Sequence, residues 1–366
     1  MKPRDHIVVA GAGIIGASIA YQLAKRGARV TILDRATPGA GATGKSLGWL
    51  NATFSKRPRA YFDLNCAGIA AWHDLEREFC GELTVQWGGS IAWFPPGAEA
   101  EQLAADVRHH QAWGYAVRPI TPAEVARALP RIAPGDIASA CHAESEGAVD
   151  PVAALEMLLL KAREFGAELH ANCEVVQLLL TEDRGLQIVC AEGTFVADRV
   201  VLACGVDSPG LAQAAGVRVP LKASPGVLVH TTPAPRLVDS IILAPGTHFK
   251  QSADGRFVAG GQIVAGVGTA ITKAELDQAA EIRQLLEIYV PALRGVEIER
   301  VTLGHRVMPV DEYPIVGFAD PKQRLYVAAT HSGVTLAPLI GRMAAAEILD
   351  GISVEAMAPY RPSRFC

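Results

Sequence analysis

Three glycines near the start of the chain have the spacing of a phosphate-binding turn. Residues 11–16 are GAGIIG, so Gly11, Gly13 and Gly16 fit the pattern GxGxxG. The first glycine of such a turn permits a tight bend, the second lets the backbone approach a pyrophosphate, and the third allows close packing of helix on strand. Asp34 follows 23 residues after Gly11 and can accept a hydrogen bond from a ribose hydroxyl. The spacing predicts a site for a dinucleotide.

The elements that must position this turn have the order of a βαβ unit. The apolar run at 6–10 is typical of a buried strand, residues 17–25 have helical composition, and 29–33 predict a second strand that ends at the acid. A GxGxxG pattern alone is weak evidence, and an accidental glycine-rich turn is the alternative. Because the same unit binds NAD or FAD, the cofactor must be decided from other parts of the chain.

Arg306 is the side chain best suited to bind an acidic substrate. It is a fixed cation that precedes an apolar strand end, and its guanidinium can bind a carboxylate through two parallel hydrogen bonds. A structural salt bridge is the alternative interpretation.

Composition excludes several classes of protein. The 366 residues suggest about two domains. The net charge of −4 argues against a nucleic-acid partner. Seven cysteines without a CxxC pair indicate reduced thiols, and no Cys/His spacing predicts a metal site. No apolar stretch approaches the roughly 20 residues of a membrane span, and no secretory signal is visible, so we expect a cytoplasmic protein.

The remaining pattern predicts two interleaved domains. Residues 99–130 look helical, 199–205 form a buried strand that enters a glycine turn, and 220–301 are rich in strands around a helix at 273–289. Residues 324–350 predict a further buried strand and an apolar helix. We therefore expect an α/β fold with a Rossmann-like nucleotide domain and a second α+β substrate domain built on a mixed or antiparallel sheet. The expected boundaries are 1–83, 145–218 and 304–366 for the nucleotide domain, and 84–144 and 219–303 for the substrate domain.

Separated segments resemble the D-amino-acid-oxidase-like family of FAD-dependent oxidoreductases, which includes glycine oxidase and monomeric sarcosine oxidase. Residues 11–35 and 42–48 are similar to the family's phosphate and flavin segments, and 200–205 match its V-V-x-A-x-G strand. Residues 304–317 and 325–338 are similar to its G-x-R, D-x-x-P-x-I-G and L-Y-V-A to L-A-P motifs. These segments follow the family order along the whole chain.

The resemblance implies noncovalent FAD, because no cysteine occurs at 304–311, where some relatives attach the flavin. The cofactor-binding residues that we predict are Gly11, Gly13, Ile14, Ile15, Gly16, Asp34, Arg35, Ala42, Thr43, Lys45, Ser46, Leu47, Gly48, Val175, Val176, Ala203, Cys204, Gly205, Arg306, His331, Ser332, Gly333, Val334 and Thr335. A glycine turn at Gly333 that opens a helix would also direct N–H groups towards the flavin edge that becomes negative on reduction.

The resemblance also implies the reaction and its side chains. The family oxidises a C–N bond: hydride passes from carbon to flavin N5, and the imine hydrolyses to an oxo acid and an amine or ammonia. We expect Arg306, Lys250, His331 and Tyr313 to act at the substrate. Lys250 would anchor substrate or assist oxygen, with a solvated surface lysine as the alternative. His331 is equally well explained as a core histidine.

The chain departs from the family pattern at three places. The stretch 330–333 is about two residues shorter, 206–208 lack the usual aromatic residue, and 223–226 lack an arginine.

The substrate is expected to be a small amino acid or secondary amine, with oxygen or another molecule as electron acceptor.

Four points stay open at this stage. The chain could be a dehydrogenase or a subunit of a heteromeric oxidase that passes electrons to a non-oxygen acceptor. It could be an NAD-dependent dehydrogenase on the same βαβ unit, or a flavin-binding protein without turnover. Its oligomeric state is also open.

Overall fold

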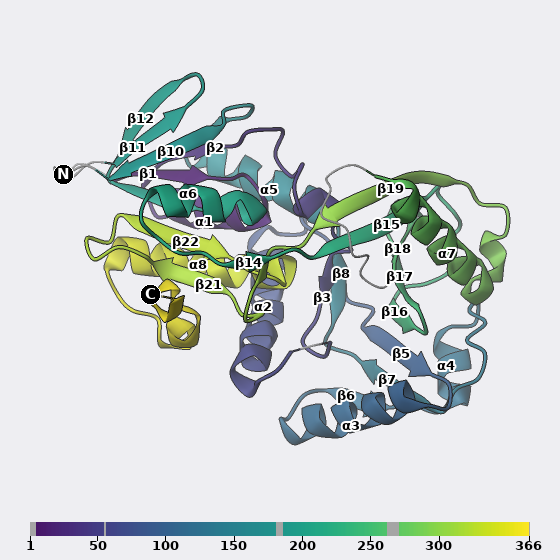
Figure 1. Ribbon diagram of the computed structural model, residues 1–366. Coiled ribbons are helices and arrows are strands. Elements are labelled where there is room, and N and C mark those ends of the chain that lie inside the picture. Colours follow the sequence, from purple (N-terminus) through teal and green to yellow (C-terminus); the bar gives the residue numbers. More distant parts are fainter. Residues whose placement is uncertain (1–4, 55, 181–185, 262–270, 366) are drawn as a thin grey trace.

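Two large sheets organise the chain in the computed structural model, which describes residues 5–54, 56–180, 186–261 and 271–365. A six-stranded sheet with its helices forms the left part of Figure 1, and an eight-stranded sheet with three helices forms the right part. The chain passes between the two parts several times, so each is assembled from separated segments.

The six-stranded sheet contains the expected βαβ unit. Its strands are, in spatial order, β21 (Ile315–Phe318), β22 (Leu325–Ala329), β13 (Arg199–Leu202), β1 (His6–Ala10), β2 (Arg29–Leu33) and β9 (Glu168–His170). Five strands run in parallel, and only β21 is antiparallel to its neighbour. Strands β1, β2, β13 and β22 are almost completely buried, as is usual for a parallel sheet covered on both faces.

Helices α1 (Ile14–Lys25), α5 (Pro151–Glu164) and α8 (Gly333–Asp350) pack together against this sheet, and α2 (Arg59–Glu78) packs on α8. Helix α1 begins directly after the glycine turn. Helix α5 begins where Asp150 caps it, accepting hydrogen bonds from Val152 N at 2.9 Å and Ala153 N at 3.1 Å. Helix α6 (Ser208–Ala214) follows β13.

The eight-stranded sheet carries the second core. Its order is β19 (Ile298–His305), β15 (Pro225–Thr231), β18 (Phe257–Gly260), β17 (Thr247–Gln251), β16 (Ile241–Ala244), β5 (Ser90–Phe94), β7 (Ser139–Ala143) and β6 (Val117–Pro119). Only β5 and β16 pair in parallel, so the sheet is mixed. Helix α7 (Lys273–Tyr289) covers β15, β17, β18 and β19, while α3 (Ala98–Ala112) packs on β5, β6 and β7, and α4 (Pro122–Ala128) follows β6.

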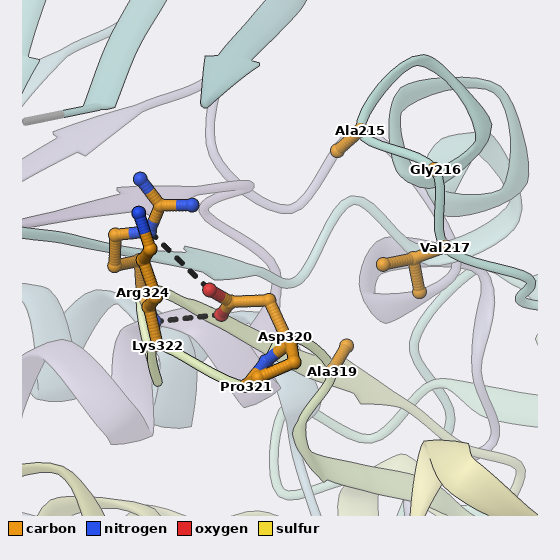
Figure 2. A pocket seen from close by; sticks show the side chains of 8 residues that line it. All are labelled: Ala215, Gly216, Val217, Ala319, Asp320, Pro321, Lys322 and Arg324. Carbon is orange, nitrogen blue, oxygen red and sulfur yellow. Dashed lines mark hydrogen bonds and ion pairs between the residues drawn. The ribbon is translucent and has the colours of Figure 1, made fainter. Parts of the chain in front are cut away.

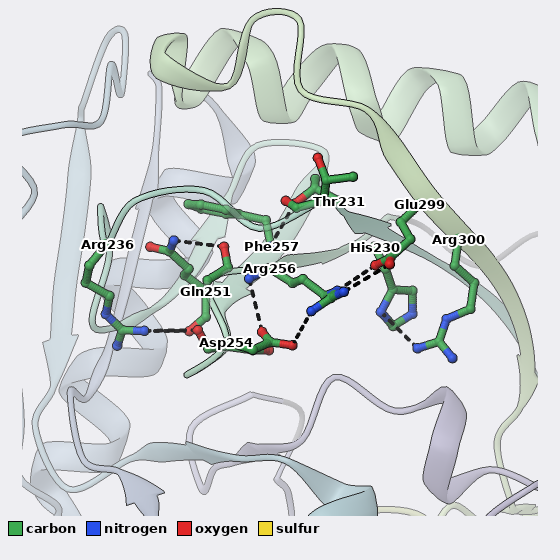
Figure 3. A network of polar contacts seen from close by, with 12 residues as sticks. His230, Thr231, Arg236, Gln251, Asp254, Arg256, Phe257, Glu299 and Arg300 are labelled. Atoms are coloured by element: carbon green, nitrogen blue, oxygen red, sulfur yellow. Dashed lines mark hydrogen bonds and ion pairs between the residues drawn. The ribbon is translucent and has the colours of Figure 1, made fainter.

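A polar network reinforces this sheet (Figure 3). Arg256 donates to Glu299 at 2.5 Å and to Asp254 at 2.9 Å, and the Phe257 amide donates to Thr231 Oγ1 at 3.0 Å. These bonds connect the start of β18 to β15 and β19. The carboxylates and the guanidinium satisfy one another, so we assign the network a structural role.

Smaller sheets complete the fold. Strands β10 (Val175–Leu180), β11 (Leu186–Cys190) and β12 (Gly193–Ala197) form an antiparallel sheet beside β1. A second small sheet has the order β3 (Trp49–Leu50), β8 (Gly147–Val149) and β4 (Val85–Gln86), and β14 (Leu221–Lys222) pairs with β20 (Met308–Pro309). Short 3₁₀ helices occur at η1 (Thr43–Lys45), η2 (Gly205–Asp207), η3 (Pro291–Leu293), η4 (Glu355–Tyr360) and η5 (Pro362–Phe365).

The predicted fold class is confirmed, and α7 has the predicted bounds. The prediction of a helical stretch at 99–130 was wrong in part, because β6 interrupts it between α3 and α4. Gly114, with φ +82°, takes a left-handed conformation that ends α3, and the chain then enters the strand. The division into domains stays a prediction. Strand β19 runs from 298 to 305, across the expected boundary between 303 and 304.

Candidate functional site

The glycine turn lies where the carboxyl ends of β1 and β13 meet, the edge at which ligands bind in parallel α/β sheets. Gly11 has φ +101°, and a Cβ there would lie 2.4 Å from the carbonyl oxygen of Ala203. A Cβ on Gly16 would lie 1.9 Å from the carbonyl oxygen of Gly11. Neither position can carry a side chain without displacing backbone, so the helix start is drawn tightly onto the strand.

Two side chains fix this turn by accepting hydrogen bonds from two of its N–H groups. Asp34 accepts from the Ala12 amide at 2.7 Å and from the Ala36 amide at 2.9 Å. Thr43 Oγ1 accepts from the Ile14 amide at 3.1 Å. The remaining amides of the first helical turn have no partner within the helix and lie at its positive dipole end. The cradle therefore fits a pyrophosphate, and a carboxylate has enough lone pairs for Asp34 to accept a ribose hydroxyl as well.

Segments far apart in the sequence meet at this cradle. Gly333, at the start of α8, packs against Ile15, to whose Cγ1 an added Cβ would lie at 3.6 Å. Thr335 Oγ1 donates to the carbonyl oxygen of Trp49 at 3.2 Å and accepts from the Asn51 amide at 3.3 Å. The side-chain oxygen of Asn51 is buried and has no hydrogen-bond donor among the described residues, as expected of a group that faces a ligand.

The loop after β2 continues from the phosphate cradle towards the second sheet. Ala42 and Thr43 begin the helical turn η1, and Lys45 packs against Gly304, where an added Cβ would lie 2.9 Å from the lysine Cβ. Ser46 Oγ accepts from the Gly48 amide at 3.3 Å. Leu47 is buried among apolar residues of β8, β15, β16 and β18. The loop thus joins the two large sheets.

The other predicted cofactor residues surround the same edge of the sheet. The Ala203 amide donates to the Ala10 carbonyl at 2.8 Å, and burial raises the pKa of the following Cys204 thiol to about 12. Gly205 begins η2. Arg35 forms an exposed ion pair with Asp207 at 2.9 Å.

A residue just before β10 is hydrogen-bonded to the residue that follows β2. The Cys173 amide donates to the Asp34 carbonyl at 2.7 Å, which places the start of β10 beside the acid. Within β10, Val175 is partly buried and Val176 is 52% exposed. Val175 therefore packs against the protein core, whereas Val176 faces outwards.

Arg306 is a half-buried cation at the end of β19. Its amide donates to the Ser224 carbonyl at 2.9 Å, and its guanidinium lies over Gly226, where an added Cβ would be 2.9 Å from Nη2. Among the described residues no carboxylate pairs with this guanidinium, so the alternative of a structural salt bridge has no support there. Burial lowers the pKa of Arg306, and its charge contributes to the lowered pKa values of His248 and His331.

Lys250 is buried, with 4% of its surface exposed, and the interpretation as a solvated surface lysine was wrong. Strand β17 directs it towards the loop after η1. Its Nζ donates to the Val149 carbonyl at 2.7 Å, and an added Cβ on Gly48 would lie 3.1 Å from that nitrogen. Burial lowers the pKa of Lys250 to about 8, although the charges of Asp150 and Asp254 act in the opposite direction.

His331, Ser332 and two tyrosines lie together near the start of α8. Burial lowers the pKa of His331 to about 3, assisted by the charges of Lys56 and Arg306, so the imidazole is neutral near pH 7. Ser332 Oγ lies 3.4 Å from His331 Nδ1 and accepts from Tyr61 OH at 3.0 Å. Tyr313 packs edge to face on Tyr61, with 5.7 Å between the ring centroids. Val334 lies near the start of α8, and its carbonyl accepts from Trp72 Nε1 at 2.9 Å.

Glu146 positions the strand β3 and was not predicted. It is fully buried and accepts from Trp49 Nε1 at 2.9 Å, the Ala52 amide at 2.8 Å and Ser90 Oγ at 2.6 Å. It also accepts from the amide and hydroxyl of Thr53, at 2.9 and 2.8 Å. Burial raises the pKa of this carboxyl, whereas these donors act against the shift. In the sequence Glu146 stands in a short acidic stretch that resembles a surface loop.

Lys56, Tyr61 and His248 are further residues of this region that sequence reasoning missed. Lys56 is 3% exposed, and its Nζ donates to Ser332 Oγ at 2.5 Å. His248 precedes the predicted Lys250 by two residues, so its side chain lies on the same face of β17. That alternation was the one available signal. Nothing local distinguishes Lys56 from a surface lysine.

A surface hollow of about 310 Å³ lies away from these residues (Figure 2). It is lined by 215–217, 319–322 and Arg324, at the amino ends of β13 and β22, whereas the cradle lies at the carboxyl ends. Asp320 is occupied by the amides of Arg324 and Leu325, each at 2.7 Å. We assign the hollow no part in the site. In the described ranges no helix is both long and apolar enough to cross a membrane.

Comparison with known proteins supplies the family. A family model described as FAD dependent oxidoreductase matches residues 6–347. The chain is 26% identical to a glycine oxidase of Geobacillus kaustophilus over 384 residues, covering 100% of this chain and 98% of the relative. It is 23% identical to one subunit of an opine oxidase of Rhizobium meliloti over 374 residues, covering 98% and 97%.

Solved structures share the fold along the whole chain. The G. kaustophilus glycine oxidase structure superposes with a TM-score of 0.90 at 24% identity, covering 98% of this chain and 99% of that one. An L-proline dehydrogenase from P. horikoshii superposes with a TM-score of 0.87 at 23% identity, covering 100% and 98%.

Proposed function

Because the chain belongs to the FAD dependent oxidoreductase family, we propose that it oxidises the C–N bond of an amino acid or an N-substituted glycine. Bound FAD would supply the two-electron oxidation of this bond, and the imine product would hydrolyse in water to an oxo acid and an amine or ammonia. We propose that FAD is held noncovalently, since no cysteine occurs at 304–311.

The observation that carries this proposal is the state of Arg306. A guanidinium that is half-buried, and that has no carboxylate partner among the described residues, is costly unless a ligand supplies the anion. Its planar donors match a carboxylate in geometry. Lys45 packs against Gly304, two residues before Arg306, and Thr43 of the same loop bonds the pyrophosphate cradle, so a substrate bound by Arg306 would lie near the cofactor.

The residues of the cradle and its surroundings would hold the cofactor in distinct ways. The amides of residues 13, 15 and 16 would bind the pyrophosphate, and Asp34 would accept a ribose hydroxyl. The start of α8 at 333–335 would place N–H groups and a positive dipole end at the flavin. Asn51, with its unpartnered side-chain oxygen, would accept a hydrogen bond from the ligand.

Lys250 and His331 would set the charge around the reacting atoms. The buried ammonium of Lys250, beside Gly48, would stabilise negative charge that develops as oxygen is reduced. Neutral His331 can accept a hydrogen bond from the substrate nitrogen without repelling a cationic amine. Tyr313 would close the pocket through its contact with Tyr61.

The similar proteins include both oxidases and a dehydrogenase, so their names do not decide the electron acceptor. A glycine oxidase and an L-proline dehydrogenase share this fold, and an opine oxidase subunit is similar over nearly its whole length. We propose oxygen as acceptor on the basis of Lys250, with an artificial dye or quinone as the alternative. A cytoplasmic location stays a prediction, which cell fractionation would test.

The proposal is tested by incubating the purified protein in air with glycine, sarcosine, proline and a series of D- and L-amino acids. We expect hydrogen peroxide and an oxo acid in equal amounts from at least one of them. Dye reduction without peroxide would identify a dehydrogenase. Turnover of amines that lack a carboxylate, in preference to amino acids, would refute the role of Arg306.

A further inference from the structure

Lys56 is a second buried cation near the proposed substrate site. It is 3% exposed, its Nζ donates to Ser332 Oγ at 2.5 Å, and the nitrogen lies 5.4 Å from the centroid of the Tyr61 ring. No carboxylate of the described residues lies within ion-pairing distance of it. The acid that affects its pKa is Glu146, whose oxygens already accept five hydrogen bonds.

An ammonium in this environment has unused binding capacity. It carries three donors, and the structure gives one of them a partner, Ser332. Burial lowers the pKa of Lys56 to about 8, so most of the side chains are still protonated near neutral pH. A charge that is desolvated without a partner is unfavourable, and an anionic ligand removes that cost.

Lys56 and Arg306 belong to different parts of the fold. Arg306 lies over Gly226 on the eight-stranded sheet, whereas Lys56 is held at the start of α8, between Ser332 and the Tyr61 of α2. Both charges act on His331. The two cations are therefore held by different elements, each with donors that an anion could use.

Resting on the proposed function, we propose that the substrate carries a second carboxylate, which Lys56 binds while Arg306 binds the carboxylate next to the reacting carbon. The substrate class is then an amine or amino acid with two acidic groups. The Tyr61 hydroxyl supports this arrangement by donating to Ser332 Oγ at 3.0 Å, which holds the acceptor that orients the Lys56 ammonium.

The test compares matched ligands on the holoenzyme. Butanoate and the dicarboxylates from malonate to adipate are titrated into the wild-type protein and the variants Lys56→Met, Lys56→Arg and Arg306→Met. Binding is measured by calorimetry and by the change in the flavin spectrum. Lys322→Met, at an exposed lysine outside the site, is the control. Thermal unfolding of each variant verifies that it folds. If Lys56→Met does not fold, Lys56→Arg still provides a variant that retains the charge.

We expect one dicarboxylate to bind the wild type at least about tenfold more tightly than butanoate, the size of effect expected for one charged hydrogen bond. Lys56→Met should abolish that preference without weakening butanoate, Lys56→Arg should keep most of it, and Arg306→Met should weaken both ligands.

Three results would overturn the inference: a wild type without preference, equal weakening of both ligands by Lys56→Met, or a changed flavin potential in that variant with the preference intact. A yellow protein that oxidises monocarboxylic amino acids and shows no preference refutes only the role of Lys56. A protein that binds no FAD refutes the proposed function itself.

Discussion

Replacing Arg306 with methionine separates a ligand-binding cation from a structural one. The guanidinium is half-buried, has no carboxylate partner among the described residues, and burial lowers its pKa. A structural salt bridge would lose stability when one partner is removed, because the other charge stays buried. Here no buried acid would be left behind. We therefore expect the ligand-free Arg306→Met protein to unfold at the same temperature as the wild type, or at a higher one.

The same substitution should weaken carboxylate binding strongly. Hydrogen bonds to charged groups contribute roughly 1.5 to 3 kcal/mol. Since about 1.4 kcal/mol corresponds to a factor of ten, the dissociation constant of a carboxylate ligand should rise roughly 10- to 160-fold. Arg306→Lys keeps the charge but loses the paired donors, so its loss should be smaller.

The assay titrates a carboxylate inhibitor into each holoenzyme and follows the flavin spectrum, with thermal unfolding of the same samples. Arg294→Met, at an exposed arginine, is the matched control and should change neither quantity. Unchanged inhibitor binding in Arg306→Met, or a stability loss of several kcal/mol without ligand, would refute the reasoning.

Three other predictions follow from particular contacts. Gly16→Ala places a methyl group against the Gly11 carbonyl and should weaken cofactor binding by about 1 to 3 kcal/mol, so less FAD should remain bound after gel filtration. Gly41→Ala, whose methyl group meets no atom within 4 Å, should retain FAD as the wild type does. Glu146→Gln should lower the free energy of unfolding by about 2 to 5 kcal/mol in denaturant titrations, because a neutral amide cannot accept all five hydrogen bonds. Glu144→Gln, at an exposed site, should change the free energy of unfolding by no more than about 0.5 kcal/mol. The pKa of His331 is about 3 in the folded protein, whereas the unfolded chain takes up the proton below about pH 6.5, so the free energy of unfolding falls as the pH is lowered between about 6.5 and 3. His331→Gln should reduce the slope of that pH dependence by about 1.4 kcal/mol per pH unit in this range. An unchanged slope would contradict the burial of a neutral imidazole.

The parts of the site that depend on local chain geometry were predictable from the sequence. The turn at 11–16 and Asp34 belong to one βαβ unit, whose strands and helix follow from hydrophobic patterns over short stretches. The helix at 273–289 could be placed for the same reason. The resemblance then indicated that distant segments meet at the turn, and the contact of Gly333 with Ile15 shows how close they lie.

The missed residues owe their position to contacts over long sequence distances. Glu146 binds the segment 49–53 across more than 90 residues, and Lys56 reaches Ser332 across 276. Nothing in the sequence around either one indicates burial. Lys250 was open to a surface interpretation because its burial depends on β17 lying in the middle of a mixed sheet, an arrangement that periodicity does not specify.

The central claim, that this chain is an FAD enzyme acting on amino acids, is tested most directly by the flavin spectrum without oxygen. We predict that the purified protein is yellow, releases FAD on denaturation, and is bleached when an amino acid with a free carboxylate is added anaerobically. A colourless protein that takes up no FAD, or a bound flavin that no amino acid reduces, would contradict the account.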